Sequence, residues 1–181
     1  MTRRADAIFY EVQYFKQQRL TALLPAAALF MIAFFAYAMY EQFVMGRPFG
    51  DEPMSDTGLG VIGPFYILLG VLFLWLYISG KLVTEVRPDG VYVLFHPLHR
   101  SPRHFPVPTI EKSETMTYRP IRDFGGWGIR HGRKGRAYNV YGNRGAYLTL
   151  IDGKRVLIGS QKADILADSI QSLIDEAQRG G

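Results

Sequence analysis

Cysteine is absent from all 181 residues. This absence excludes disulfide bonds, thiolate catalysis and cysteine-based zinc or iron–sulfur sites. Charged residues are absent from two long stretches: 21 consecutive uncharged residues run from Leu20 to Tyr40, and 24 run from Thr57 to Gly80. The mean hydropathy of the whole chain is nevertheless close to zero. The apolar residues are therefore concentrated in the first 80 positions.

Both uncharged stretches are long enough to cross a bilayer, because about 20 helical residues at ~1.5 Å each span a hydrocarbon core of ~30 Å. Buried helices of a soluble protein are usually shorter and amphipathic, and the rest of this chain is too small to cover two of them. A cleavable signal peptide would have a shorter apolar run. We therefore expect a transmembrane helical hairpin over 20–80, with an outer loop at 41–56.

The charges that flank the two stretches are asymmetric. Residues 1–19 carry four basic and two acidic side chains, whereas 41–56 carries four acidic side chains and Arg47 alone. Residues 81–179 add 16 basic and 10 acidic side chains. Short segments rich in Lys and Arg stay on the cytoplasmic side. Both termini are therefore predicted to be cytoplasmic, in a multi-pass protein of the cell (inner) membrane.

The segment before the first stretch has helical spacing. Ile8, Val12 and Phe15 fall on one face of a helix, with further aromatic residues beside them. Aromatic side chains favour the headgroup region, so residues 1–19 are predicted to form a cytoplasmic or interfacial helix. The alternative is a simple N-terminal extension of the first span.

Beyond residue 80 the pattern changes to short strands and turns. Pro88-Asp89-Gly90 is a turn signal between strands predicted at Lys81–Arg87 and Val91–His96. Residues 161–178 repeat apolar positions at helical spacing after Ser160, which is a suitable N-cap residue. Further strands are predicted at 126–130, 137–141, 146–151 and 155–158, and the segments 105–107 and 110–118 can supply one or two more.

About seven strands followed by one C-terminal α-helix is the element order of a pleckstrin-homology-like (PH-like) domain, in which the helix plugs one end of a bent barrel. The predicted fold is therefore a membrane helical hairpin plus a mostly-β, PH-like domain over 81–181. This analogy rests on element order and implies no function.

Several motifs strengthen this prediction. They are EVQYFKQ at 11–17, YRPI at 118–121, GGWGIR at 125–130, AYNVYGNRG at 137–145 and LIGSQ at 157–161. With these motifs the chain resembles an uncharacterised prokaryotic family of two-helix membrane proteins with a C-terminal PH-like domain, over nearly its whole length. The resemblance implies this architecture and transfers no catalytic residue, substrate or cofactor.

A basic stretch at 130–136 is the first candidate site. Arg130, Arg133, Lys134 and Arg136 lie there, and Arg144 follows in a glycine-containing turn. Each Lys or Arg near an anionic leaflet contributes about 1 kcal/mol, so these residues are candidate contacts for lipid headgroups or a partner. An ordinary solvated hairpin loop is the alternative. Nucleic acid is not expected as a partner, because interleaved stacking aromatics are missing.

Three histidines, His96, His99 and His104, lie close together in the sequence. Their spacing matches no zinc template, and Arg100 and Arg103 would repel a cation. We therefore predict no metal site and no cofactor. A small metalloenzyme built on these histidines is the least favoured alternative.

No nucleophile triad, phosphate-binding glycine loop or paired-acid arrangement is evident, so an enzyme is not expected. The preferred function is a membrane-anchored binding or scaffold module. It would dock a protein partner, or serve as an accessory subunit of a membrane complex, at the cytoplasmic face. The alternative is an anionic-lipid sensor that uses the 130–136 loop.

Overall fold

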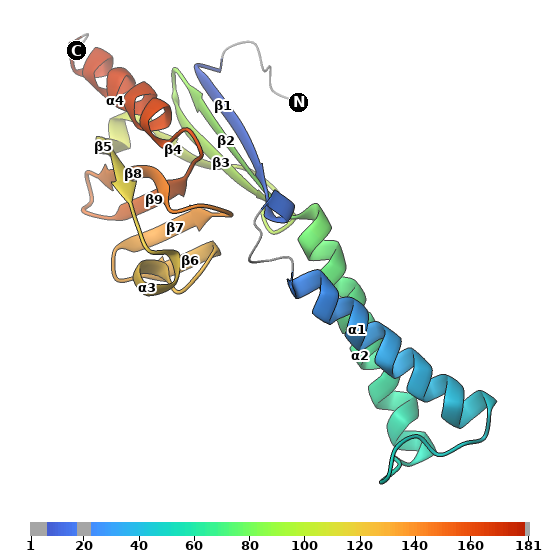
Figure 1. Ribbon diagram of the computed structural model, residues 1–181. Coiled ribbons are helices and arrows are strands. Elements are labelled where there is room, and N and C mark those ends of the chain that lie inside the picture. Colours follow the sequence, from blue (N-terminus) through green and yellow to red (C-terminus); the bar gives the residue numbers. More distant parts are fainter. Residues whose placement is uncertain (1–6, 18–22, 180–181) are drawn as a thin grey trace. The chain divides into compact units, whose positions relative to one another are not determined.

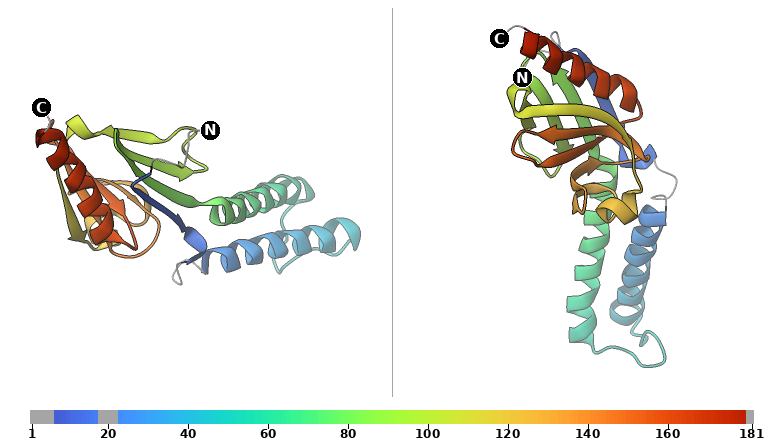
Figure 2. Two further views of the ribbon diagram at one scale, coloured as in Figure 1. Left: turned by 90° about the horizontal axis from the view of Figure 1, so that it is seen from above. Right: turned by 90° about the vertical axis from the view of Figure 1, so that its left-hand side faces the viewer.

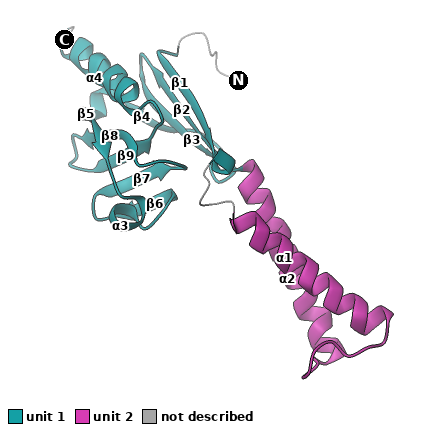
Figure 3. Ribbon diagram, in the orientation of Figure 1, with its two compact units in different colours: residues 1–18, 80–181 teal, residues 19–79 magenta. Residues whose placement is uncertain are grey.

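The computed structural model describes residues 7–17 and 23–179, which fall into two compact units (Figure 3). Unit 1 comprises residues 1–18 and 80–181, and unit 2 comprises residues 19–79. The segment that precedes the first apolar stretch therefore belongs to the β-rich unit. The domain predicted over 81–181 is incomplete without it.

Unit 2 consists of two apolar helices. α1 spans Leu23–Met39 and continues as a π-helical segment over Tyr40–Val44, and α2 spans Asp56–Ser79. By length and composition, both are able to cross a membrane. The connecting loop is 45–55, shorter than the predicted 41–56, because helical structure extends to Val44 and resumes at Asp56. Gln42 closes this loop by donating hydrogen bonds to the Met54 carbonyl (2.8 Å) and the Asp56 carboxylate (2.7 Å).

Two glycines of α2 let the helices approach closely. A Cβ at Gly70 would lie 2.6 Å from Cγ1 of Ile32 and 3.1 Å from the Ala28 carbonyl oxygen. A Cβ at Gly63 would lie 2.6 Å from Sδ of Met39. Small residues allow this kind of contact between the backbones of apolar helices. Unit 2 is therefore packed along a small-residue face.

The first sheet of unit 1 begins with a strand where a helix was expected. β1 (Phe9–Tyr14) pairs antiparallel with β2 (Lys81–Arg87), so the helix predicted over 1–19 is wrong at these positions, and a 3-10 turn follows at Phe15–Gln17. Phe9 and Gln13 are buried while Tyr10 is exposed, in a stretch rich in aromatic and β-branched residues. β3 (Gly90–His96) and β4 (Arg103–Pro106) complete the order β1-β2-β3-β4 (Figure 1). The pairing partner of β1 follows α2, some 70 residues along the chain, and local spacing does not reveal it.

Polar side chains fasten β1 to the end of the β region. Gln13 is 1 % exposed and donates from Nε2 to the Gly159 carbonyl oxygen (2.7 Å). The Glu11 carboxylate accepts hydrogen bonds from the Ser160 hydroxyl (2.6 Å) and the Gln161 backbone N–H (3.0 Å). The N-terminal strand is therefore an integral part of unit 1.

The second sheet has five strands in the order β5-β8-β9-β7-β6. All neighbours are antiparallel except β7 and β9, which run parallel. A 3-10 turn at Val107–Thr109 precedes this sheet, and the short helix α3 (Pro120–Phe124) lies between its first two strands in sequence. In the described part of the chain, eight strands follow residue 80 where about seven were predicted; each overlaps a predicted strand, and β1 is a further one that was not predicted. The strands of this sheet are β5 (Ile110–Thr117), β6 (Gly128–Gly132), β7 (Gly135–Asn139), β8 (Arg144–Leu150) and β9 (Arg155–Gly159).

The C-terminal helix α4 (Ala163–Arg179) packs on β5 and β8 (Figures 1 and 2). The prediction of a helix over 161–178 is confirmed within a few residues, and the Ser160 hydroxyl accepts a hydrogen bond from the Lys162 N–H (2.9 Å). Leu166 and Ile170 of this helix share one core with Leu82 and Leu148 of the two sheets. A second buried cluster lies by α3 and comprises Tyr118, Phe124, Ala137, Tyr147 and Leu157.

Candidate functional site

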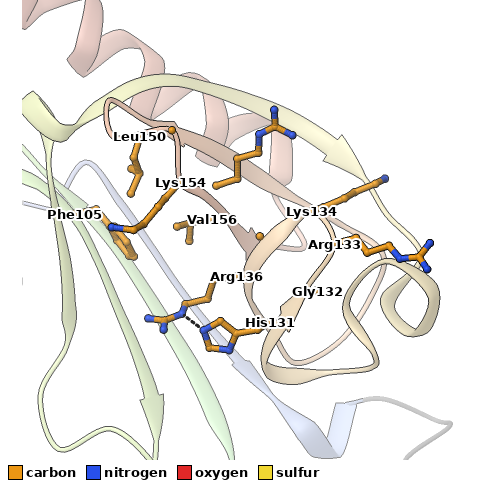
Figure 4. A pocket seen from close by; sticks show the side chains of 12 residues that line it. Phe105, His131, Gly132, Arg133, Lys134, Arg136, Leu150, Lys154 and Val156 are labelled. Carbon is orange, nitrogen blue, oxygen red and sulfur yellow. Dashed lines mark hydrogen bonds between the residues drawn. The ribbon is translucent and has the colours of Figure 1, made fainter.

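A cleft of about 770 Å³ opens on unit 1 between the β6–β7 turn and the β8–β9 turn (Figure 4). Phe105, Leu150 and Val156 supply its apolar wall. Its remaining side chains are cationic or titratable to a cation, and we call this site the basic cleft. These side chains are His131, Arg133, Lys134, Arg136, Lys154 and Arg155.

Strand pairing brings the two turns together. β6 and β7 form a hairpin that ends at Gly132 and Gly135, and β7 runs parallel to β9 with Arg136 opposite Val156. Gly135 has φ +106°, and a Cβ at this position would collide with the Arg155 carbonyl oxygen. Glycine is therefore required for the hairpin end to approach β9. The arrangement places basic residues from two distant segments on one cleft.

Two lysines of the cleft are paired with carboxylates. Lys134 Nζ lies 3.3 Å from Asp123, and Lys154 Nζ lies 2.6 Å from Asp152. A hydrogen bond from the Arg119 backbone N–H, together with Lys134, lowers the pKa of Asp123. Hydrogen bonds from the side chain and backbone N–H of Lys154 lower the pKa of Asp152. Both carboxyls therefore stay ionised at neutral pH, and they neutralise the two lysines only.

The three arginines of the cleft lack such partners. Within residues 7–17 and 23–179, Arg133, Arg136 and Arg155 form no ion pair with a carboxylate. Arg136 instead donates from Nε to Nε2 of His131 (2.8 Å) and from Nη1 to the Tyr138 hydroxyl (3.3 Å). Figure 4 shows the Arg136 and His131 side chains next to each other on the wall of the cleft. The cleft therefore carries uncompensated positive charge.

The structure gathers three of the five predicted contact residues in this cleft: Arg133, Lys134 and Arg136. Arg130 and Arg144 do not line it. Arg130 donates from Nε to the Trp127 carbonyl oxygen (2.9 Å), and Arg144 pairs with Asp164 at the start of α4 (2.8 Å).

His131, Lys154 and Arg155 also line the cleft, although none of them is a predicted contact residue. The sequence signal for Lys154 and Arg155 is the Asp152-Gly153 turn, because these two basic residues follow it directly. Their place beside the β6–β7 hairpin depends on the parallel pairing of β7 with β9. Local patterns do not show this pairing.

The other three histidines have separate surroundings. His99 Nδ1 accepts a hydrogen bond from the Phe95 N–H (3.3 Å), whereas His104 stacks on Tyr92 with ring centroids 4.2 Å apart. His96 is exposed at the end of β3. Burial and the charges of Arg103 and Arg136 lower the pKa of His99. In the described part of the chain, no group of three histidine or carboxylate side chains is arranged to hold a metal ion.

The chemistry of the basic cleft suits an oxyanion. Guanidinium and ammonium groups are donors only, and their charge-assisted hydrogen bonds to phosphate oxygens are shorter and stronger than neutral ones. Arginine in particular presents a planar set of N–H groups that matches phosphate geometry. The side chains of the cleft are therefore chemically suited to an anionic oxygen ligand.

Comparison with known proteins shows the family of the chain. No curated protein and no solved structure matches it. Residues 1–176 match a family model described as "Family of unknown function (DUF6141)". This match includes β1, both apolar helices, all the later strands and nearly all of α4. The chain therefore belongs to the DUF6141 family.

Proposed function

We propose that this protein is a membrane-anchored, non-enzymatic binding module whose basic cleft binds an anionic, phosphate-bearing ligand. The observation that carries the proposal is the convergence of the β6–β7 and β8–β9 turns on one cleft. Three arginines line this cleft without a carboxylate partner in the described residues. Such a site favours phosphate, whether it is a lipid headgroup or part of a soluble molecule.

The two apolar helices supply the anchor in this proposal. Large side chains such as Phe30 (71 % exposed) and Leu68 (67 % exposed) point away from the helix pair. Water does not favour such surfaces, whereas lipid does. A signal sequence is a poor alternative for α1, because its removal would also remove β1 and the buried Gln13.

The pairing of β1 with β2 supports the proposed topology. β1 precedes α1 and β2 follows α2, and Tyr14 lies opposite Lys81 in their shared register. In a two-span protein, both ends of the helical hairpin must then lie on the same side of the bilayer. The excess of Lys and Arg in these segments supports the cytoplasmic side, and we propose the cell (inner) membrane of a prokaryotic cell as the location.

We also propose that unit 1 is a PH-like domain. Two sheets that share a core with a C-terminal helix support it. The added strand β1, which precedes the two apolar helices, departs from the element order on which the analogy rests.

Among binding modules, the structure supports an anion-binding form ahead of a protein-docking form. Strand addition needs an accessible sheet edge. The edge strands of the two sheets are β1 and β4, and β5 and β6. β4 has four residues and ends in a proline, which disfavours such pairing, whereas β5 has eight residues and is long enough for it. The uncompensated positive charge of the basic cleft, and not the sheet edges, is the reason that the accessory-subunit role comes second to ligand binding.

The test is calorimetric titration of inorganic phosphate into the full-length protein in nanodiscs of phosphatidylcholine. The variant Arg133→Ala/Arg155→Ala removes two cleft charges, each worth about 1 kcal/mol, so we expect the affinity to fall roughly 30-fold. The matched control Arg130→Ala/Arg144→Ala removes two charges outside the cleft and should retain wild-type affinity. Wild-type protein that binds no phosphate, or a cleft variant that binds as tightly as wild type, would contradict the proposal.

A second arm identifies the source of the phosphate. The same titration is repeated in nanodiscs that contain phosphatidylglycerol. If lipid headgroups occupy the cleft, the soluble phosphate must compete with them and its apparent affinity falls. An unchanged affinity assigns the cleft to a soluble ligand.

A further inference from the structure

The loop between β3 and β4, residues 97–102, continues from a defined end of the first sheet. β3 runs antiparallel to β2, so its last residue, His96, lies opposite Lys81, the first residue of β2. Only Gly80 separates Lys81 from Ser79, the last residue of α2. The 97–102 loop therefore extends from the end of the sheet at which the chain passes into an apolar helix.

β1 ends at the same place and brings aromatic and basic residues to it. Tyr14, the last residue of β1, lies opposite Lys81, and the ammonium group of Lys16 lies 5.3 Å from the centroid of the Tyr14 ring. The Phe15 backbone N–H donates to the Gly80 carbonyl oxygen (3.2 Å). Aromatic and basic side chains of this kind are typical of the segments that flank membrane-spanning helices. This end of the sheet therefore has the composition of a surface next to a bilayer.

The 97–102 loop is held by one residue that points inward. The His99 backbone N–H donates to the Phe95 carbonyl oxygen (2.8 Å), and its ring lies edge-to-face on Tyr138 with centroids 5.8 Å apart. The residues on either side of it point outward. Leu98 is 62 % exposed, and Arg100 is exposed as well. The loop therefore presents an apolar and a basic side chain to its surroundings.

The basic side chains of this loop region carry uncompensated charge. Within residues 7–17 and 23–179, Arg100 and Arg103 form no ion pair with a carboxylate. A single exposed leucine is ordinary on a protein surface, and Leu98 is significant only because of its position. Beside a membrane helix, an apolar side chain can enter the boundary of headgroups and acyl chains while neighbouring cations attract anionic lipids. An anionic bilayer surface matches both properties of the loop.

We propose that residues 97–102 form a membrane-contact loop, in which Leu98 enters the boundary between lipid headgroups and acyl chains. Arg100 and Arg103 contact the phosphates of anionic lipids around it. This inference rests on the proposed anchorage by α1 and α2, and it does not involve the basic cleft. The loop gives unit 1 an attachment to the bilayer in addition to its covalent links to the two helices.

Site-directed fluorescence tests the contact directly. Because the chain lacks cysteine, Leu98→Cys creates a single site for an environment-sensitive fluorophore. In full-length protein in nanodiscs that contain phosphatidylglycerol, we expect this label to be shielded from acrylamide in the water and quenched by nitroxides on the acyl chains. The matched control is Ile8→Cys. Ile8 is 52 % exposed, and its N–H donates to the Val86 carbonyl oxygen at the opposite end of the sheet, so acrylamide alone should quench this label.

The contribution of charge is measured on the same label. Adding Arg100→Gln to Leu98→Cys removes one cation from the loop, and the ratio of lipid-shielded to water-exposed label should fall roughly fivefold. Replacing phosphatidylglycerol with phosphatidylcholine should lower the ratio in the same direction. The matched control is Arg179→Gln, an exposed arginine at the end of α4. The last turns of α4 border the β2–β3 turn, where Ala177 and Pro88 line one pocket, so this substitution should leave the ratio unchanged.

A third label separates this inference from the anchorage on which it rests. Leu68→Cys places the fluorophore on an exposed position of α2, where a bilayer would shield it. If the label at position 68 is shielded while the label at position 98 is as accessible to acrylamide as the label at position 8, the membrane-contact loop is overturned and the anchorage stands. If acrylamide quenches the label at position 68 as well, both are overturned. A shielded fraction at position 98 that is the same with and without Arg100 and phosphatidylglycerol overturns the contact with anionic phosphates.

Discussion

The two units of this protein differ in where their large apolar side chains lie: they are mostly buried in unit 1 and mostly exposed in unit 2. In unit 1, Leu148 and Ile158 are fully buried, and the exposed faces of the strands are polar. In unit 2, Phe30 and Leu68 lie outside, whereas the contact between the helices is made by small residues such as Gly70. Hydrophobic burial therefore accounts for the stability of the first unit, and close backbone packing accounts for that of the second.

The two tryptophans allow each unit to be followed separately. Trp75 lies in α2 and Trp127 precedes β6. A Trp75→Phe background leaves a fluorophore in unit 1, and a Trp127→Phe background leaves one in unit 2. Urea unfolding of the full chain in detergent then gives a signal that belongs to one unit at a time.

The largest expected effect tests the burial of apolar side chains in unit 1. Leu148→Ala removes a fully buried side chain from the shared core, and its cavity should lower the free energy of unfolding of unit 1 by about 2–5 kcal/mol. The matched substitution Leu68→Ala in unit 2 removes an exposed side chain and should cost about 0.5 kcal/mol or less. If both substitutions lowered the free energy of unfolding equally, Leu148 could not be buried while Leu68 is exposed.

The next effect concerns alkaline pH and unit 1 alone. Burial raises the pKa of Tyr118 to about 12, and its hydroxyl accepts a hydrogen bond from Asn139 Nδ2 (3.2 Å). The folded state thus holds this proton above pH 10, where the unfolded state releases it. The contribution of Tyr118 is complete below pH 10 and is lost as the pH rises toward 12, by roughly 2–3 kcal/mol.

Urea unfolding of unit 1 at pH 9 and pH 12 measures this loss. Tyr118→Phe is the control: it should be less stable at pH 9, because a buried N–H of Asn139 loses its partner, but it should show a smaller drop between the two pH values. The same drop in both proteins would assign the alkaline sensitivity to other groups.

The smallest of the three effects tests the small-residue contact in unit 2. Gly70→Ala places a Cβ 2.6 Å from Ile32 and 3.1 Å from the Ala28 carbonyl oxygen. We expect the separation of the helices to destabilise unit 2 by about 1–3 kcal/mol. At Gly60 the nearest atom, Cζ of Phe43, would be 3.8 Å from the new Cβ, so Gly60→Ala should be neutral or slightly stabilising. Trp75 fluorescence during urea unfolding measures the stability of unit 2 in both variants. If Gly70→Ala were as stable as wild type, the close contact of Gly70 with α1 would be refuted.

Local sequence patterns predicted much of this architecture correctly. The two uncharged stretches coincide with α1 and α2, and the Pro88-Asp89-Gly90 turn lies between β2 and β3 as predicted. The apolar periodicity after Ser160 coincides with α4. Each of these features depends on residues close together in the chain, where spacing and turn chemistry determine the conformation.

Two features depend on tertiary structure alone: the strand conformation of β1 and the set of residues that line the basic cleft. The stretch Phe9–Tyr14 is compatible with a helix or a strand by its own pattern, and it becomes a strand because β2 offers its backbone hydrogen bonds and Gly159 receives the side chain of Gln13. Lys154 and Arg155 join Arg133 and Arg136 because β9 pairs with β7. Such pairing is a property of the folded sheet, in which strands far apart in sequence satisfy each other's hydrogen bonds and bury a common core.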